Sequence, residues 1–153
     1  MLKPIFTICF LLISIVSFSQ ENDTSFELCQ DVDVYPYYRP ELTYKGGFWE
    51  IKQHFTRNYP AEIFQVLKNN SGIITVQFKI NCQGETGDFV VQQCDLNYQP
   101  TVLDKVISDY FLEKAKTLKN WIPAQDEEGN VVNSHKFFSF RIKKGDLLEI
   151  LPK

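Results

Sequence analysis

Residues 73–81 read IITVQFKIN, and this stretch decides the fold of the chain. Every second side chain is apolar, and the apolar face holds Ile74, Val76, Phe78 and Ile80. Such alternation predicts a β-strand with one buried face. The next segment, CQGETG (82–87), supplies two glycines for a turn, and DFVVQQC (88–94) returns as a second strand. The centre of the fold is therefore predicted to be a β-hairpin.

The C-terminal half adds a helix and a third strand. Apolar residues recur with a period near 3.6 over 101–119, which predicts the longest helix of the chain. The residues that set this period are Val102, Val106, Tyr110, Leu112, Ala115 and Leu118. KFFSFRI (136–142) predicts a third strand, and GDLLEILPK (145–153) a short strand or extended segment. These elements predict an α+β domain, a small three-stranded antiparallel sheet with helices packed on one face.

Two short helices are predicted before the hairpin. FWEIKQHFTRN (48–58) places apolar residues at helical spacing, and PAEIFQVLKNN (60–70) begins with a proline, which is favoured in a first helical turn. The predicted order is α-α-β-β-α-β within one domain over 44–153. Residues 20–43 are polar and aromatic without periodicity, so we expect an extended lead-in there.

Residues 1–19 have the features of a secretory signal peptide. Lys3 precedes an apolar run over 5–16, and Ser17-Phe18-Ser19 forms a small-x-small cleavage pattern. The run has about 12 residues, fewer than the roughly 20 that span a bilayer. We expect cleavage after Ser19, a periplasmic location and no stable membrane insertion of the mature chain. An uncleaved inner-membrane anchor is the alternative.

Three cysteines follow the predicted signal peptide: Cys29, Cys82 and Cys94. An oxidising compartment permits one disulfide among them. In a hairpin that turns at 84–87, Cys94 lies opposite about Gln77, roughly 17 Å along the strand from Cys82. A disulfide needs Cα atoms within about 7 Å. We therefore favour Cys29–Cys82 over Cys82–Cys94, with three unpaired thiols as the alternative.

Composition and spacing give little support for nucleic-acid binding, metal binding or catalysis. The net charge is −3, and basic residues are scattered among acidic ones, which argues against nucleic acid. His54 and His135 fall in no known catalytic spacing, and the carboxylates of Glu85, Asp88 and 126–128 flank turns. These turns lack the ligand spacing of an EF-hand loop, and the cysteines and histidines do not indicate zinc. We expect no enzyme, no metal and no cofactor.

An ordered set of residues carries a family resemblance. The set comprises Tyr44, Gly46-Gly47, Tyr59-Pro60, Gly72 before VQFKI, Gly84, Gly87, Trp121-x-Pro123-Ala124 and Gly129. With these spacings, 44–150 resembles the C-terminal domain of TonB energy transducers in the form common in the Bacteroidetes group.

The same residues have structural interpretations. Gly72, Gly84 and Gly87 suit turns that need positive φ. Trp121 is a large apolar side chain that could close the seam between the long helix and the sheet. Pro123 is expected to keep that helix from continuing.

The resemblance implies a peptide-binding function. In TonB proteins this domain lies in the periplasm and captures the TonB box, an extended peptide of an outer-membrane receptor, as a strand added to the sheet edge. By analogy we assign the peptide-binding edge to the last predicted strand, at Lys136, Phe137, Ser139 and Arg141. The segment LLEILP (147–152) could fold back on this edge, and an edge already paired offers no backbone groups to a peptide.

A true transducer also has an inner-membrane helix and a long Pro-rich spacer. The lead-in of about 28 residues (20–47) reaches only about 100 Å when fully stretched, and disordered chains are more compact. We therefore expect a soluble TonB-like adaptor with a protein or peptide partner, accessory to TonB-dependent transport. The alternatives are a homodimer paired through the sheet edge and an envelope protein that binds peptidoglycan.

Overall fold

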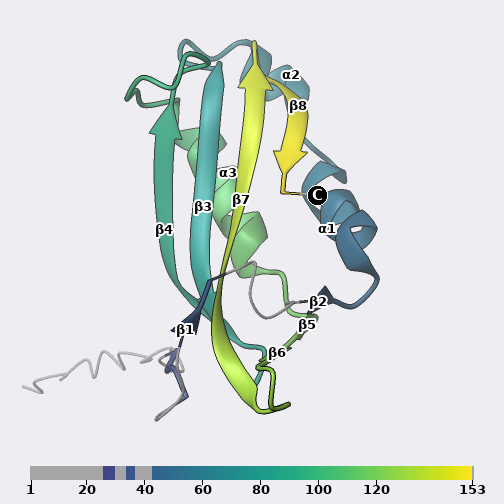
Figure 1. Cartoon of the computed structure of the whole chain (residues 1–153). Coiled ribbons are helices and arrows are strands. Elements are labelled where there is room, and N and C mark those ends of the chain that lie inside the picture. Colours follow the sequence, from purple (N-terminus) through teal and green to yellow (C-terminus); the bar gives the residue numbers. More distant parts are fainter. Residues whose placement is uncertain (1–25, 30–33, 37–42, 153) are drawn as a thin grey trace, which may run out of the picture.

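A computed structural model describes residues 26–29, 34–36 and 43–152 (Figure 1). The predicted signal peptide at 1–19 lies outside these residues. The described part of the chain is an α+β fold with three helices, a six-stranded sheet and a separate two-stranded sheet. The α+β class is confirmed, whereas the expectation of a three-stranded sheet is wrong because short strands from both ends of the chain extend it.

The elements run in an order that keeps the predicted central pattern. Their bounds are β1 Val34–Tyr35, β2 Thr43–Tyr44, α1 Gly47–Thr56, α2 Ala61–Gln65, β3 Gly72–Ile80, β4 Thr86–Cys94, α3 Lys105–Lys116, β5 Trp121–Ile122, β6 Ala124–Gln125, β7 Val131–Lys143 and β8 Asp146–Leu151.

Strand β7 organises the main sheet because it is 13 residues long and is paired on both sides. One side runs antiparallel to β3 over the whole length of that strand, and β4 continues the sheet beyond β3. The other side pairs antiparallel with β8 near the C-terminal end of β7 and parallel with β1 near its start. The parallel pair makes the sheet mixed instead of purely antiparallel.

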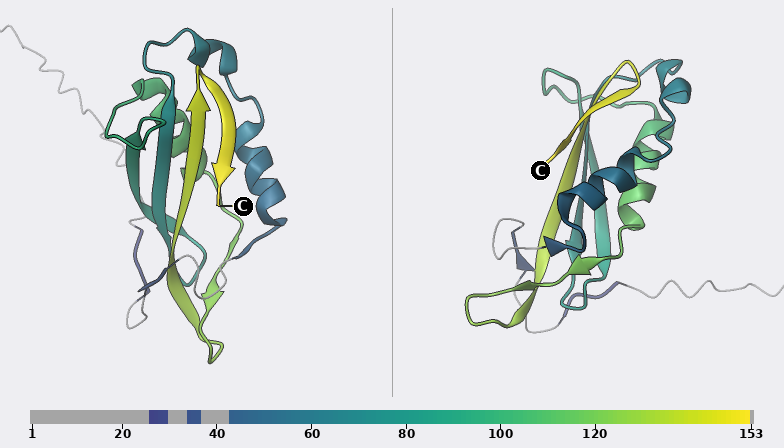
Figure 2. Two further views of the ribbon diagram at one scale, coloured as in Figure 1. Left: turned by 45° about the horizontal axis from the view of Figure 1, so that its top comes forward. Right: turned by 90° about the vertical axis from the view of Figure 1, so that its right-hand side faces the viewer.

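The helices pack on one face of this sheet, as the edge-on view in Figure 2 shows. The alternating burial of β3 follows the sequence pattern, with Ile74, Val76, Phe78 and Ile80 fully inside. Phe111 of α3 stacks on Phe140 of β7 with ring centroids 4.0 Å apart, and Phe55 of α1 lies 4.7 Å from Phe140. Within the described ranges, no helix has the length and apolar character needed to cross a membrane.

The hairpin turns earlier than predicted. The backbone N–H of Asn81 donates to Glu85, and Ile80 pairs with Thr86, so the turn spans 81–85 and Gly87 lies in β4. Asp88, with φ 51°, lies in a register shift opposite Gln77 to Lys79, which is the geometry of a β-bulge. Cys94 consequently lies opposite Ile73 and not Gln77.

Two helices are shorter than their patterns predicted because polar side chains cap them. The Asp104 carboxylate accepts the N–H of Val106, so α3 starts at Lys105, while 101–104 stays extended and buries Leu103. At the end of α2, the Asn70 amide donates to the carbonyls of Phe64 and Gln65. Capped carbonyls of this kind terminate a helix after a single turn or two.

Candidate functional site

The strand predicted to offer an open edge is largely an interior strand. Ser139 pairs with Thr75 on one side and Leu151 on the other, and Arg141 pairs with Ile73 and Glu149. The prediction of an open edge at Ser139 and Arg141 is therefore wrong, because the tail folds back and pairs there. On the side of β7 that faces away from β3, the pairing with β8 ends at Ser139 and the pairing with β1 ends at Ser134. Lys136 and Phe137 lie between these two paired stretches.

The side chain of Lys136 lies on the helix-facing side of β7. Its Nζ is 5.5 Å from the ring centroid of Phe138, and burial lowers the pKa of Lys136. Side chains alternate along a strand, so Phe137, Ser139 and Arg141 share the opposite face. The four predicted residues thus belong to two faces of β7 and do not form one recognition surface.

A tight turn fixes the strand that replaces the predicted edge. Lys144 and Gly145 both have positive φ, which suits a two-residue hairpin between Lys143 and Asp146. The N–H of Gly145 donates to Asn70, and the Tyr59 hydroxyl donates to the carbonyl of Gly145, at 2.8 Å in both cases. Strand β8 is therefore anchored to residues on both sides of α2 and is a fixed member of the sheet.

The surroundings of Tyr59 also raise the pKa of its hydroxyl. Burial raises the pKa of Tyr59 well above its ordinary value, and the nearby Tyr110 and Asp146 raise it further by charge repulsion. Tyr110, whose hydroxyl donates to the carbonyl of Phe55, has a pKa raised by burial as well. Both phenols act as neutral donors: Tyr59 holds the turn before β8, and Tyr110 holds α1 against α3.

The outer side of β8 faces helix α1 across a groove of about 200 Å³. Phe48, Lys52 and Thr56 line the helix side of this groove at intervals of four residues, which places them on one stripe of α1. The opposite wall is formed by 147–150, and Leu148 is 57% exposed there. Within the described residues, β8 pairs only with β7, so its outer backbone groups face this groove.

The opposite edge of the sheet, β4, is of a different kind. In the part of the chain that the structure describes, β4 pairs only with β3, and Val90 is 50% exposed. A bulge at Asp88 interrupts this edge, and the Asp88 carboxylate forms an ion pair with Lys79 at 2.8 Å. Bulges and charges are common protections against strand addition. Strand β8 also has a register shift, at Leu148 between its pairs at Leu147 and Glu149, but the groove between it and α1, with both apolar and polar residues in its walls, makes it the better docking edge.

Sequence reasoning missed the groove, although two signals for it were present. The dipeptide Lys144-Gly145 between two apolar runs is a hairpin signal that predicts the pairing of β8 with β7. Phe48, Lys52 and Thr56 form a second stripe of α1 beside the buried Ile51 and Phe55. The sequence could not show that β8 lies alongside this stripe of α1.

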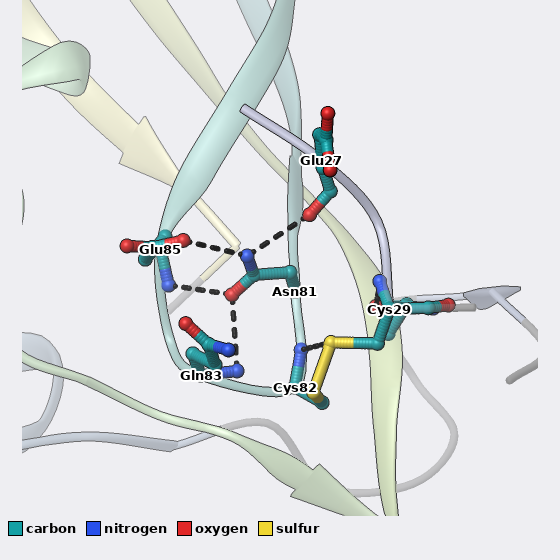
Figure 3. Close-up of a disulfide and its surroundings, with 7 residues drawn as sticks. Glu27, Cys29, Asn81, Cys82, Gln83 and Glu85 are labelled. Atoms are coloured by element: carbon teal, nitrogen blue, oxygen red, sulfur yellow. Dashed lines mark hydrogen bonds between the residues drawn. A yellow bond between two sulfur atoms is a disulfide. The ribbon is translucent and has the colours of Figure 1, made fainter. Parts of the chain in front are cut away.

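The Cys29–Cys82 disulfide is confirmed, with Cα atoms 6.0 Å apart (Figure 3). Cys94 is a free, half-buried thiol at the far end of β4. The buried side chain of Asn81 forms hydrogen bonds with both of the segments that the disulfide joins. Its amide Nδ2 donates to the carbonyl of Glu27, and its Oδ1 accepts the N–H groups of Gln83 and Glu85. Asn133 of β7 exchanges two 3.1 Å bonds with the backbone of Cys29.

The predicted structural glycines have different roles. Gly84 has φ 82°, and a Cβ there would lie 2.8 Å from the carbonyl oxygen of Trp121, so a turn and a close approach both require it. Gly87 does not have positive φ, contrary to the prediction, but provides the space that the ring of Phe26 occupies. Gly72 lacks room for a side chain beside the backbone of Cys94.

Trp121 and Pro123 follow the long helix. Trp121 is buried, with its ring centroid 4.9 Å from Tyr44 and 5.7 Å from Phe78, so it closes the end of the core between β2 and the sheet. Pro123 does not terminate α3, because that helix already ends at Lys116 and β5 intervenes. The expected role of Pro123 as the helix stop is therefore wrong.

Three of the titratable residues considered for catalysis, His54, Glu85 and Asp126, form hydrogen bonds within the fold. The ring Nε2 of His54 lies 2.8 Å from the carbonyl of Lys114 and so ties α1 to the end of α3, whereas His135 is exposed on β7. The Glu85 carboxylate accepts a bond from Asn81. Asp126 accepts bonds within its own turn, and the bonds from Asn130 lower its pKa. The bonds of Glu85 and Asp126 therefore stabilise the turns in which they lie.

Comparison with protein-family models, with curated proteins and with solved structures found no match.

Proposed function

We propose that this chain is a periplasmic protein-binding module, without catalytic activity, that captures an extended peptide by adding it as a strand to the outer side of β8. The observation that carries the proposal is the groove between β8 and the Phe48–Lys52–Thr56 stripe of α1. A sheet edge supplies backbone donors and acceptors, and an adjacent groove supplies contacts for alternate side chains. An edge strand with a helix beside it combines both.

The groove favours a peptide of mixed character. Phe48 and Leu148 offer apolar contact, while Lys52 and Glu149 place one charge of each sign on opposite walls. Successive peptide side chains point to opposite faces, so every second residue would enter the groove. A segment of alternating apolar and polar residues satisfies this arrangement best.

The family resemblance supports the choice of partner. The ordered residues from Tyr44 to Gly129 resemble a domain that binds the TonB box of outer-membrane receptors. We propose an outer-membrane TonB-dependent receptor, or another envelope transport component with an exposed extended segment, as the partner. The docking edge differs from the one first assigned, since β8 covers β7 at Ser139 and Arg141.

Site-specific photocrosslinking in the native organism tests this proposal. A photoreactive residue is placed at Leu148 beside the groove, at Val90 on β4, or at Ser139 on the outer sheet face. Of these three positions, we expect only Leu148 to give crosslinks to an envelope protein. Self-crosslinks from Val90 would support an edge-paired homodimer, and recovery of peptidoglycan fragments would support envelope attachment; either result without a Leu148 crosslink overturns peptide capture at β8.

A charge substitution provides a second test. Leu148→Glu places a carboxylate beside the groove and should abolish the crosslink from a photoreactive residue at Thr56, the facing wall. Val66→Glu is the matched control, because Val66 is 83% exposed and lies outside the groove. Equal crosslinking in both variants would contradict the assignment of the groove.

A further inference from the structure

A second cavity, separate from the β8 groove, lies along another side of α1. Its volume is about 550 Å³, which lies in the range of about 300–1,000 Å³ usual for small-molecule sites. Glu50, Gln53 and His54 of α1 line it, together with Arg57, the residue that follows the helix. At about 100° per residue these positions share one helix face, and that face points away from the stripe that lines the β8 groove.

The walls of this cavity carry an excess of positive charge. Lys45 comes from the turn before α1, Arg57 from the end of α1 and Lys114 from the last turn of α3, against the single carboxylate of Glu50. Among the described residues, the ion pairs involve Lys79, Lys105 and Lys116, and none of the three cations of the cavity. Lys114 is directed toward Tyr110, with its Nζ 5.7 Å from the ring. Lys45 and Arg57 are thus the cations available to a ligand.

Hydrogen bonds hold the walls in place. A carbonyl oxygen can only accept, so His54 donates from Nε2 to the carbonyl of Lys114 at 2.8 Å. The Thr117 hydroxyl donates to the same carbonyl at 2.9 Å, and the N–H of Lys45 donates to Asn120. These bonds fix the distance between α1 and α3 and occupy a helix-end carbonyl that would otherwise repel an anion.

We propose that this cavity binds a small anionic ligand through the charged groups of Lys45 and Arg57, independently of the peptide edge. The ligand chemistry is a carboxylate or a phosphate, since the planar guanidinium of arginine pairs with either through two parallel hydrogen bonds. The amides of Gln53 and Asn120 line the same space and can bond the polar groups next to the acid. Glu50 limits the negative charge that the cavity accepts.

The test is a titration of the purified chain, with the Cys29–Cys82 disulfide intact, followed by the NMR shifts of its backbone amides. Inorganic phosphate and citrate serve as probes at constant ionic strength, and the tighter of the two identifies the preferred acid group. We expect saturable shifts at 45–57 and 114–120. Arg57→Gln should weaken binding about tenfold or more, because loss of a charge-assisted hydrogen bond of about 1.4 kcal/mol gives that factor.

Three controls decide between a site and a general charge effect. Arg141→Gln removes the same charge from the outer sheet face and should leave the affinity unchanged within about twofold. Glu50→Gln removes the carboxylate and should tighten binding, and Leu148→Glu should have no effect. Equal weakening by Arg57→Gln and Arg141→Gln, weakening by Glu50→Gln, or shifts that never saturate would overturn the proposal. Dispersion of the Arg57→Gln spectrum shows whether that variant is folded.

Discussion

Two strands share the second side of β7, and they are held there in different ways. Strand β8 follows β7 after a two-residue turn, and its turn is docked at the end of α2. Strand β1 pairs with residues about a hundred positions away and contributes only two residues. The segment that precedes it is held by a disulfide and by two buried asparagines that bond the backbone of Glu27 and Cys29. A remote strand must offset a loop-closure cost that a hairpin strand does not face.

The largest predicted effect comes from removing the disulfide that tethers the segment before β1. The double variant Cys29→Ser/Cys82→Ser opens a loop with a sequence separation of 53. The chain-entropy relation then gives a loss of about 4 kcal/mol in the free energy of unfolding. Urea unfolding of the variant and the oxidised protein measures it. Cys94→Ser, which removes the free thiol, should change stability by less than about 1 kcal/mol.

The next effect breaks the docking of β8. Gly145→Ala would place a Cβ 2.4 Å from the backbone nitrogen of Gln65 at φ 82°. We expect a loss of about 3 kcal/mol, because neither backbone can move without breaking the turn. Gly129→Ala has nearly the same φ and no neighbour within 4 Å, so it should cost only about 1 kcal/mol. Thermal unfolding of both variants isolates the docking contribution; equal losses would show that the clash is relieved.

A smaller effect separates the hydrogen bonds of Asn81 from the disulfide as two ways of holding the segment before β1. Asn81→Ala leaves the carbonyl of Glu27 and two turn N–H groups without this side chain. We expect a loss of about 2 kcal/mol with the disulfide still formed. Asn97→Ala, an exposed loop asparagine, is the control and should be neutral within about 0.5 kcal/mol. A neutral Asn81→Ala would mean that the disulfide alone positions the segment.

The smallest effect concerns a single bond at the β8 turn. Tyr59→Phe removes the hydroxyl that donates to Gly145 and should cost about 1 kcal/mol at neutral pH. Tyr98→Phe, at an exposed position, is the control.

The same tyrosine predicts a pH dependence. Burial keeps the folded-state pKa of Tyr59 above its ordinary value, so above about pH 10 the unfolded chain ionises first. The unfolded state then binds fewer protons than the folded one, and the free energy of unfolding falls as pH rises. Urea unfolding at increasing pH should show this fall in the native protein and a shallower fall in Tyr59→Phe. An unchanged slope would assign the effect to Tyr110 and other groups.

The comparison also explains how far sequence reasoning reached. Periodicity predicted β3, β4, α1 and α3 because burial on one face is recorded in neighbouring residues. Geometry of the hairpin also excluded Cys82–Cys94 correctly, although it placed the turn a few residues late. The pairing of β1 could not be predicted, since two residues carry no period and their partners, Asn133 and Ser134, lie far along the chain.

The candidate site was harder to predict than the fold. Lys136, Phe137, Ser139 and Arg141 were assigned from the strand that carries the edge in the resembling domain. Because the C-terminal tail folds back, β8 pairs with Ser139 and Arg141. The edge of the sheet there is therefore β8 and not β7. The prediction of strand addition itself is still to be tested at β8.

The long sequence distance between Cys29 and Asn133 has a consequence for the order of events as the chain folds. The disulfide joins Cys29 to the β3–β4 hairpin, so it can close before β7 has paired with the rest of the sheet. The tethered segment is then held at the end of the hairpin, next to the position that β7 takes in the sheet. Without the disulfide, the same segment would have to find its parallel partner from solution after the rest of the sheet had formed.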